Sequence, residues 1–191
     1  MARTGPTIRK RQVEAVLEEW PAAAADAATA IMDRYGAPDR VTSEWLCWYE
    51  NGPWKRTLVY RDGVPHEFPE PHVDHVEQVI DYHVPPRYYD AIGRFHGSVT
   101  PRRTRGELCV ECKDEPQNVL ALNLVHDVVT EQKSVTEARD LFTEAYAKLV
   151  AGGNPEYTQG LQFDLPRDDQ RDPGRSTLSN GIMRRAEWQL E

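Results

Sequence analysis

The sequence predicts an α+β fold, in which antiparallel β-hairpins pack against several helices within a single compact domain. Two observations lead to this prediction. Asn51-Gly52 separates two runs of aromatic and β-branched residues, which is the strongest short signal for a hairpin. Strand-like and helix-like segments are also segregated along the chain, and do not alternate as they would in a parallel α/β sheet.

Length and composition indicate one domain with polar ends. The chain has 191 residues, of which 39% are hydrophobic, and it includes 5 Trp and 8 Tyr. Disordered chains lack such aromatic content, so we expect a folded core. We predict a polar N-terminal arm over residues 1–17 and a single α+β domain over 18–166. A polar, extended or disordered C-terminal tail is predicted over 167–191.

The first half of the domain begins with a helix and a hairpin. Proline suits a first helical turn and glycine a helix end, so a helix is predicted from Trp20-Pro21 to Gly36. The hairpin around Asn51-Gly52 follows. With a period of two, its first strand places Trp45, Cys47 and Tyr49 on one face, and its second strand places Trp54, Leu58 and Tyr60 on one face.

The middle of the chain is predicted to contain a loop over 64–71 and a short helix over 72–82. Val73, Val76 and Ile80 follow helical spacing, and Pro85-Pro86 ends the segment. Another short helix is expected before Gly97.

The second half is predicted to combine extended chain with two long helices. Residues 98–112 read as a second hairpin around Arg105-Gly106. The helix predicted over 115–130 is apolar on all sides, which indicates burial. Ser134 and Glu137 form a capping-box pattern that begins an amphipathic helix ending at Gly152-Gly153.

Charge and cysteine content favour a cytoplasmic protein without a nucleic-acid or membrane partner. The net charge is −8, and the basic clusters at 9–11 and 101–105 are short and surrounded by acidic residues. No stretch approaches the roughly 18 apolar residues that span a bilayer. The 3 cysteines, an odd number, suit a reducing compartment.

A resemblance covers most of residues 30–166. The stretches "NGPWKRTLVYRD", "PHEFPEPHVDHVEQVIDYHVPP", "GSVTPRRTRGELCVEC" and "NVLALNLVHDVVT" resemble a family of uncharacterised bacterial proteins, as do "SVTEARDLF" and "YTQGLQFDLP". That family has no assigned activity. The resemblance implies one intact bacterial domain and implies no chemistry.

The segment "HEFPEPHVDH", residues 66–75, is the candidate metal site. On a helix His72 and His75 would project to one face at i and i+3, and His66 would reach the same pocket from the preceding loop. Imidazoles in this arrangement would hold a divalent transition metal. The alternative is a polar loop with helix-capping carboxylates, in which Glu70 precedes the first turn.

Four other residues are candidates for catalysis. The buried helix 115–130 carries Asn123 and His126 at i and i+3, and buried polar groups need partners. Glu107 on the preceding extended segment could provide one, close to Cys112, and such a cluster could support acid–base or thiol chemistry. The alternative is that Asn123 and His126 bond to backbone groups of a neighbouring loop.

Aromatic residues of the hairpin suggest a ligand pocket. Trp45, Trp54 and Tyr60 either belong to the core or form the wall of a pocket beside the His-rich loop. The first hypothesis is therefore a cytosolic protein that binds a small molecule or a metal ion, and that is either an enzyme or a binding protein. The alternative is a non-catalytic homo-oligomeric interaction or accessory protein, since established catalytic signatures are absent.

Overall fold

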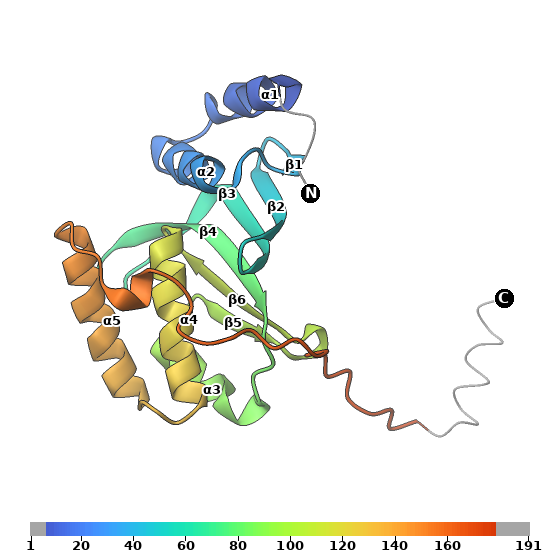
Figure 1. Cartoon of the computed structure of the whole chain (residues 1–191), viewed down its shortest axis with the longest axis vertical. Helices are drawn as coiled ribbons and strands as arrows, with labels where there is room; N and C mark the ends of the chain where they lie inside the picture. The colour runs from blue at the N-terminus through green and yellow to red at the C-terminus, as the bar shows by residue number, and fades with distance from the viewer. Residues whose placement is uncertain (1–6, 179–191) are drawn as a thin grey trace.

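The computed structural model describes residues 7–178 and contains a six-stranded sheet in the order β1-β2-β3-β4-β6-β5 (Figure 1). All neighbouring strands are antiparallel, and the predicted α+β class is confirmed. The strands are β1 (Arg40–Val41), β2 (Trp45–Asn51), β3 (Trp54–His66), β4 (His72–Asp81), β5 (Val99–Arg102) and β6 (Glu107–Cys112). The helices are α1 (Thr7–Leu17), α2 (Ala22–Tyr35), α3 (Tyr89–Phe95), α4 (Glu115–Val129) and α5 (Val135–Val150), with 3-10 turns at Pro86–Tyr88, Arg103–Arg105 and Glu156–Thr158.

The helices cover one face of the sheet, which we call the core face (Figure 1). Buried side chains on this face alternate with residues that point the other way. Beneath α2 they are Leu46, Trp48, Val59 and Val76, and beneath α4 and α5 they are Ile80, Leu108, Val110 and Cys112. The opposite face, which we call the open face, is covered by no helix among residues 7–178.

Most predicted elements are confirmed. The first hairpin is present, and its turn consists of Gly52 and Pro53 between the paired residues Asn51 and Trp54. The second hairpin turns at Arg105-Gly106, where Gly106 has a φ of 64°. The helices predicted near 21–36, 115–130 and from Ser134 correspond to α2, α4 and α5. The side chain of Ser134 accepts from the backbone N–H of Glu137, and the capping box is complete.

The predicted face of Trp54 is wrong. Its side chain lies on the core face and is only 1% exposed, whereas Leu58 and Tyr60 lie on the open face. Glu50 has a φ of 48° beside the turn, so the alternation of side chains shifts there. Asn51 and its partner Trp54 therefore both turn towards the helices.

The helix predicted over 72–82 is also wrong, because His72–Asp81 form the central strand β4. This strand has neighbours on both sides and is largely buried on both faces. A strand of this kind lacks the polar–apolar alternation that identifies a half-exposed strand, and its valines satisfied a helical spacing by coincidence. The residues that face the helices are instead Asp74, Val76, Gln78 and Ile80.

The predicted arm and tail are partly described. Within the arm, Thr7–Leu17 form α1, where Val13 is buried against the α2 cluster. Within the tail, residues 167–178 contain no helix or strand, and Arg103 pairs with Asp172 at 2.7 Å. Residues 1–6 and 179–191 lie outside the described part. No helix in the described part is both long and apolar enough to cross a membrane.

Charged side chains neutralise one another on the open face. Arg56 donates two hydrogen bonds to Glu107, at 3.0 and 2.9 Å, and Lys55 lies 3.2 Å from the same carboxylate. Burial alone would raise the pKa of Glu107, but these cations lower it to about 2. Glu111 has no such partner among the described residues. Burial raises the pKa of Glu111 to about 7, with further contributions from Glu77 and Asp74.

Because Glu111 lacks the cationic partners that Glu107 has, Glu111→Gln should change the stability of the protein to a degree that depends on pH. The pKa of Glu111 is higher in the folded chain than in the unfolded chain, so its contribution to stability is lost as pH rises from about 4.5 through 7. After allowance for solvent screening, we expect the variant to be about 1–2 kcal/mol more stable than the natural protein at pH 8, and nearly equal at pH 5. Urea unfolding at the two pH values measures this. The exposed variant Glu44→Gln is the control, and a pH-independent effect of Glu111→Gln would contradict the prediction.

Candidate metal centre

The end of the β3–β4 hairpin brings two histidines and an aspartate together on the core face. His66, the last residue of β3, is the register partner of His72, the first residue of β4. Directly opposed residues in antiparallel strands point to the same face, and residues two apart on one strand do too. Asp74 therefore lies on the same face of the sheet as the imidazoles of His66 and His72.

The three side chains converge closely. His66 Nδ1 lies 3.1 Å from Asp74 Oδ2, and His72 Nε2 lies 3.0 Å from Asp74 Oδ1. One ligand atom from each residue lies within 4.8 Å of the other two. Two ligands that bind one ion at about 2.1 Å lie about 3.0 Å apart at a right angle and about 3.4 Å apart at the tetrahedral angle. The 3.0 Å between His72 Nε2 and Asp74 Oδ1 matches the distance between two ligands that bind one ion at a right angle.

Three atoms of this group are buried and have no hydrogen-bond partner. They are His66 Nδ1, His72 Nε2 and Asp74 Oδ1. Both imidazole nitrogens are near the carboxylate, but neither contact has the direction of a hydrogen bond. Buried polar atoms are almost always satisfied, and each unsatisfied atom costs about 1–3 kcal/mol. A cation bound between the three atoms would satisfy all of them.

Neighbouring groups orient two of the three side chains. His72 Nδ1 lies 2.7 Å from the backbone oxygen of Glu70, and since a carbonyl only accepts, Nδ1 carries the proton. The lone pair of His72 therefore lies on Nε2, which faces Asp74. Ser98 donates to Asp74 Oδ2 at 2.8 Å and leaves Oδ1 for the cluster. Metal-binding histidines and carboxylates are typically held by outer hydrogen bonds of this kind.

His96 and Cys112 form a second layer behind the group. The His96 ring packs edge-on against His66 with centroids 4.9 Å apart, and its Nδ1 accepts from the Ser98 N–H. Burial lowers the pKa of His96 to about 3, and the neighbouring histidines and Arg139 add to this, so the ring is neutral. His96 Nε2 lies 3.9 Å from Cys112 Sγ. Burial raises the pKa of the Cys112 thiol well above its usual value, which makes it a poor nucleophile.

Two imidazoles and one carboxylate form a recognised ligand set. Catalytic zinc sites use three protein ligands with a further position left for water, and non-haem iron(II) sites use two histidines and one carboxylate. Within residues 7–178 no fourth His, Cys, Asp or Glu belongs to the group. A metal ion held here would retain at least one position for a ligand from outside the protein.

Removing the hydrogen bond from Ser98 to Asp74 is expected to lower the metal affinity without abolishing binding. Ser98→Ala removes the hydrogen bond that orients the Asp74 carboxylate but leaves all three ligands in place. We expect metal affinity to fall by about 10- to 100-fold, as for other outer-shell groups. Competition with a chromophoric chelator measures the affinity. Ser43→Ala, at an exposed position, should bind as the natural protein does. Equal affinity in Ser98→Ala would show that this hydrogen bond does not orient a ligand.

The structure does not bring His75 to this group. His75 follows Asp74 on the strand and points to the opposite face, where its Nδ1 lies 3.1 Å from the backbone oxygen of Tyr60. His66 and His72 are therefore the two predicted ligands that the structure places together. Asp74, Ser98 and His96 were missed by the sequence analysis. Asp74 was identifiable only if residues 72–74 were assigned to a strand.

The predicted aromatic pocket residues are divided between the two faces. Trp45 and Tyr60 are register partners on the open face, and the Tyr60 hydroxyl lies 3.3 Å from Glu77. Trp54 is buried on the core face, where its Nε1–H donates to Glu115. The three side chains therefore do not line one pocket.

The four predicted catalytic residues are also separated. Glu107 pairs with Arg56 on the open face, whereas Cys112 is buried on the core face beside His96. Asn123 donates to the backbone oxygens of residues 157 and 160 and accepts from the N–H of residue 162, as the alternative interpretation predicted. His126 stacks on Phe163 with ring centroids 4.2 Å apart and bonds to Tyr82.

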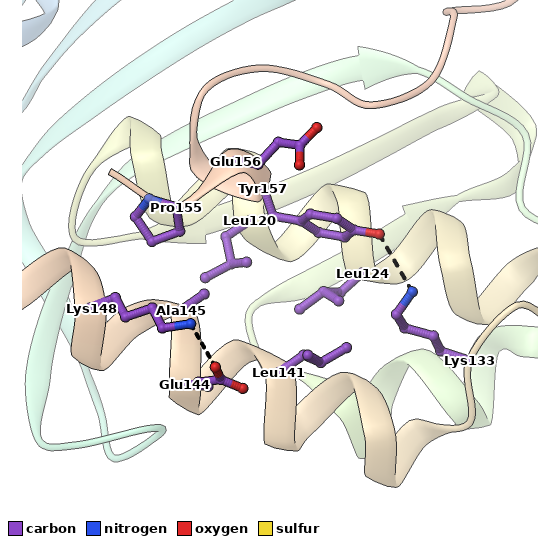
Figure 2. Close-up of a pocket in the computed structure, with 10 residues that line it drawn as sticks. All are labelled: Leu120, Leu124, Lys133, Leu141, Glu144, Ala145, Lys148, Pro155, Glu156 and Tyr157. Carbon is purple, nitrogen blue, oxygen red and sulfur yellow. Dashed lines mark hydrogen bonds and ion pairs between the residues drawn. The ribbon is translucent and has the colours of Figure 1, made fainter. Parts of the chain in front are cut away.

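A separate apolar pocket of about 300 Å³ lies between α4, α5 and the turn Glu156–Thr158 (Figure 2). Leu120, Leu124, Leu141 and Ala145 form its apolar part. Two of the charged groups at its edge are paired: Lys133 with Asp127 at 2.7 Å, and Lys148 with Glu144 at 2.6 Å. None of the three metal-site residues lines this pocket, and it contains no orphaned polar atom.

Comparison with known proteins adds no functional information. No protein-family model, curated protein or solved structure matches this chain. The resemblance to a bacterial family remains a prediction, and the functional argument depends on the geometry of the chain itself.

Proposed function

We propose that this protein binds a divalent transition metal ion through His66 Nδ1, His72 Nε2 and Asp74 Oδ1. The observation that supports this most strongly is the convergence of three buried ligand atoms that lack hydrogen-bond partners. An ordinary polar cluster would satisfy these atoms within the protein. The proposal retains the metal-binding part of the sequence hypothesis and replaces His75 by Asp74.

The ligand types favour a transition metal. Imidazole suits zinc, iron, copper and nickel, whereas calcium and magnesium prefer sites made of oxygen ligands alone. The incomplete ligand set further favours a site at which a metal-bound water or another small ligand exchanges. On this proposal the protein is a metal-dependent binding protein or enzyme.

Elemental analysis of untagged protein tests the proposal. We expect about one equivalent of a transition metal per chain after dialysis against zinc, iron(II) or manganese(II), followed by removal of free metal. We also expect magnesium and calcium to give no stable complex at the same concentrations. Occupancy far below one equivalent for every transition metal tried would contradict the proposal.

A further inference from the structure

We propose that the metal-loaded site binds a small anion, of the size of azide or a short carboxylate, at its open coordination position, and that Arg139 strengthens this binding electrostatically. This inference depends on the metal site proposed above. The exogenous ligand is a small anion, and Arg139 contributes to its binding without being a metal ligand.

The metal-loaded site would carry a net positive charge. A divalent ion bound by two neutral imidazoles and one carboxylate leaves one net positive charge. Asp74 is almost fully buried, and His72 retains only 6% side-chain exposure. Charge is poorly screened in such surroundings, so an anion in the open position is favoured over neutral water. Among the other carboxylates of this region, Glu70 accepts from Tyr146 and Asp114 caps α4, whereas Glu111 interacts electrostatically with Asp74 from the open face.

Arg139 of α5 places a second positive charge beside the loop that carries the site. Its guanidinium carbon lies 3.8 Å from the centre of the Phe68 ring, in the loop that joins His66 to His72. Phe68 packs against His96, and His96 packs against His66. Arg139 is therefore connected to the proposed ligand His66 through Phe68 and His96, which meet by edge-on ring contacts.

Arg139 has no carboxylate partner in the part of the chain that the structure describes. Its Nη1 donates to the backbone oxygens of Phe95, at 2.7 Å, and Arg94, at 3.4 Å. These contacts fix the guanidinium but do not neutralise it. Its charge adds to that of the metal ion, and two like charges near one open position raise the affinity for an anion.

Exposure limits the size of the ligand. His66 retains 15% side-chain exposure, and the other two ligands have 6% and 1%. His66 is therefore the most exposed of the three proposed ligands. Because so little of the group is exposed, we expect it to bind ligands of a few atoms in preference to larger molecules.

Cobalt(II) provides a test that separates this inference from the metal site itself. The visible spectrum of the cobalt-loaded protein reports the ligands of the ion, so we expect azide and acetate to change it saturably. Arg139→Gln should bind cobalt as the natural protein does and raise the azide dissociation constant by about 3- to 10-fold. Arg139→Lys should restore most of the affinity. Arg94→Gln, which removes an exposed arginine paired with Asp90, should change nothing.

Each result has a distinct meaning. Failure to bind cobalt would overturn the metal site. Cobalt binding with a spectrum that azide and acetate leave unchanged would overturn the anion inference alone. Equal azide affinity in Arg139→Gln and the natural protein would overturn the role of Arg139. Thermal unfolding of the metal-free proteins checks that all three arginine variants are folded.

Discussion

Replacing His72 by alanine is expected to weaken transition-metal binding by at least about 100-fold, because a direct ligand is lost where outer-shell changes already cost 10- to 100-fold. His66→Ala and Asp74→Asn should have effects of the same size. Asp74→Asn is the most informative variant, since it keeps the shape of the side chain and removes only the charged ligand. Isothermal titration with zinc, at matched pH and salt, measures all three.

The same variants should lose metal-induced stabilisation. Free metal at 100 times its dissociation constant stabilises the folded chain by about 2.7 kcal/mol, provided that the unfolded chain binds it weakly. We expect this increase in the natural protein and its absence in the three variants. Urea unfolding with and without zinc measures it, and the metal-free curves show whether each variant folds.

His75→Asn is the matched control for this experiment. It removes a histidine from the same strand but from the opposite face, and its amide can still donate to the backbone oxygen of Tyr60. We expect unchanged zinc affinity. If His75→Asn loses zinc as His72→Ala does, the ligand set predicted from a helix was right and the one read from the structure is wrong. If no variant changes binding, the ion lies elsewhere.

The fold was predictable where local signals are strong. The Asn51-Gly52 signal located a turn in which Gly52 adopts a positive φ of 76°, and the capping box of Ser134 marks a helix start in four residues. The strand β4 was not predictable in this way. Its burial depends on its pairing with both β3 and β6 and on α2 and α4, which pack over the core face. β6 and both helices are distant from β4 in sequence, so no local alternation identifies the strand.

The assignment of residues 72–82 to a helix, in place of strand β4, decided how much of the site could be predicted. A helix groups His72 with His75, whereas a strand groups His72 with Asp74 and turns His75 away. His66 was predicted as a ligand that reaches the pocket from a loop, whereas in the structure it is the last residue of β3. Ser98 and His96 come from the chain after α3, and only the packing of α3 against the sheet brings Ser98 to Asp74 and His96 to His66.

The second large effect is expected at Glu115, in the first turn of α4. Its carboxylate has 6% exposure and accepts from four side chains on three other elements: Arg34 and Tyr35 of α2, Trp54 of β3 and Gln78 of β4. These contacts connect α2 and α4 to the central strands β3 and β4 of the sheet. Burial, followed by the charge of Glu115, raises the pKa of Tyr35 to about 12, so its hydroxyl remains a donor.

Glu115→Ala should therefore destabilise the protein by about 3–5 kcal/mol, because it leaves several buried donors without an acceptor. Trp54→Phe removes one of the four donors and keeps the ring, so we expect a loss of only about 1 kcal/mol. In the double variant the loss of the Trp54–Glu115 contact is counted once, so its total should be smaller than the sum of the single effects. Urea unfolding of the four proteins measures this coupling. Strict additivity would show that Glu115 and Trp54 act independently, and a loss below 1 kcal/mol in Glu115→Ala would show that water replaces the carboxylate at little cost.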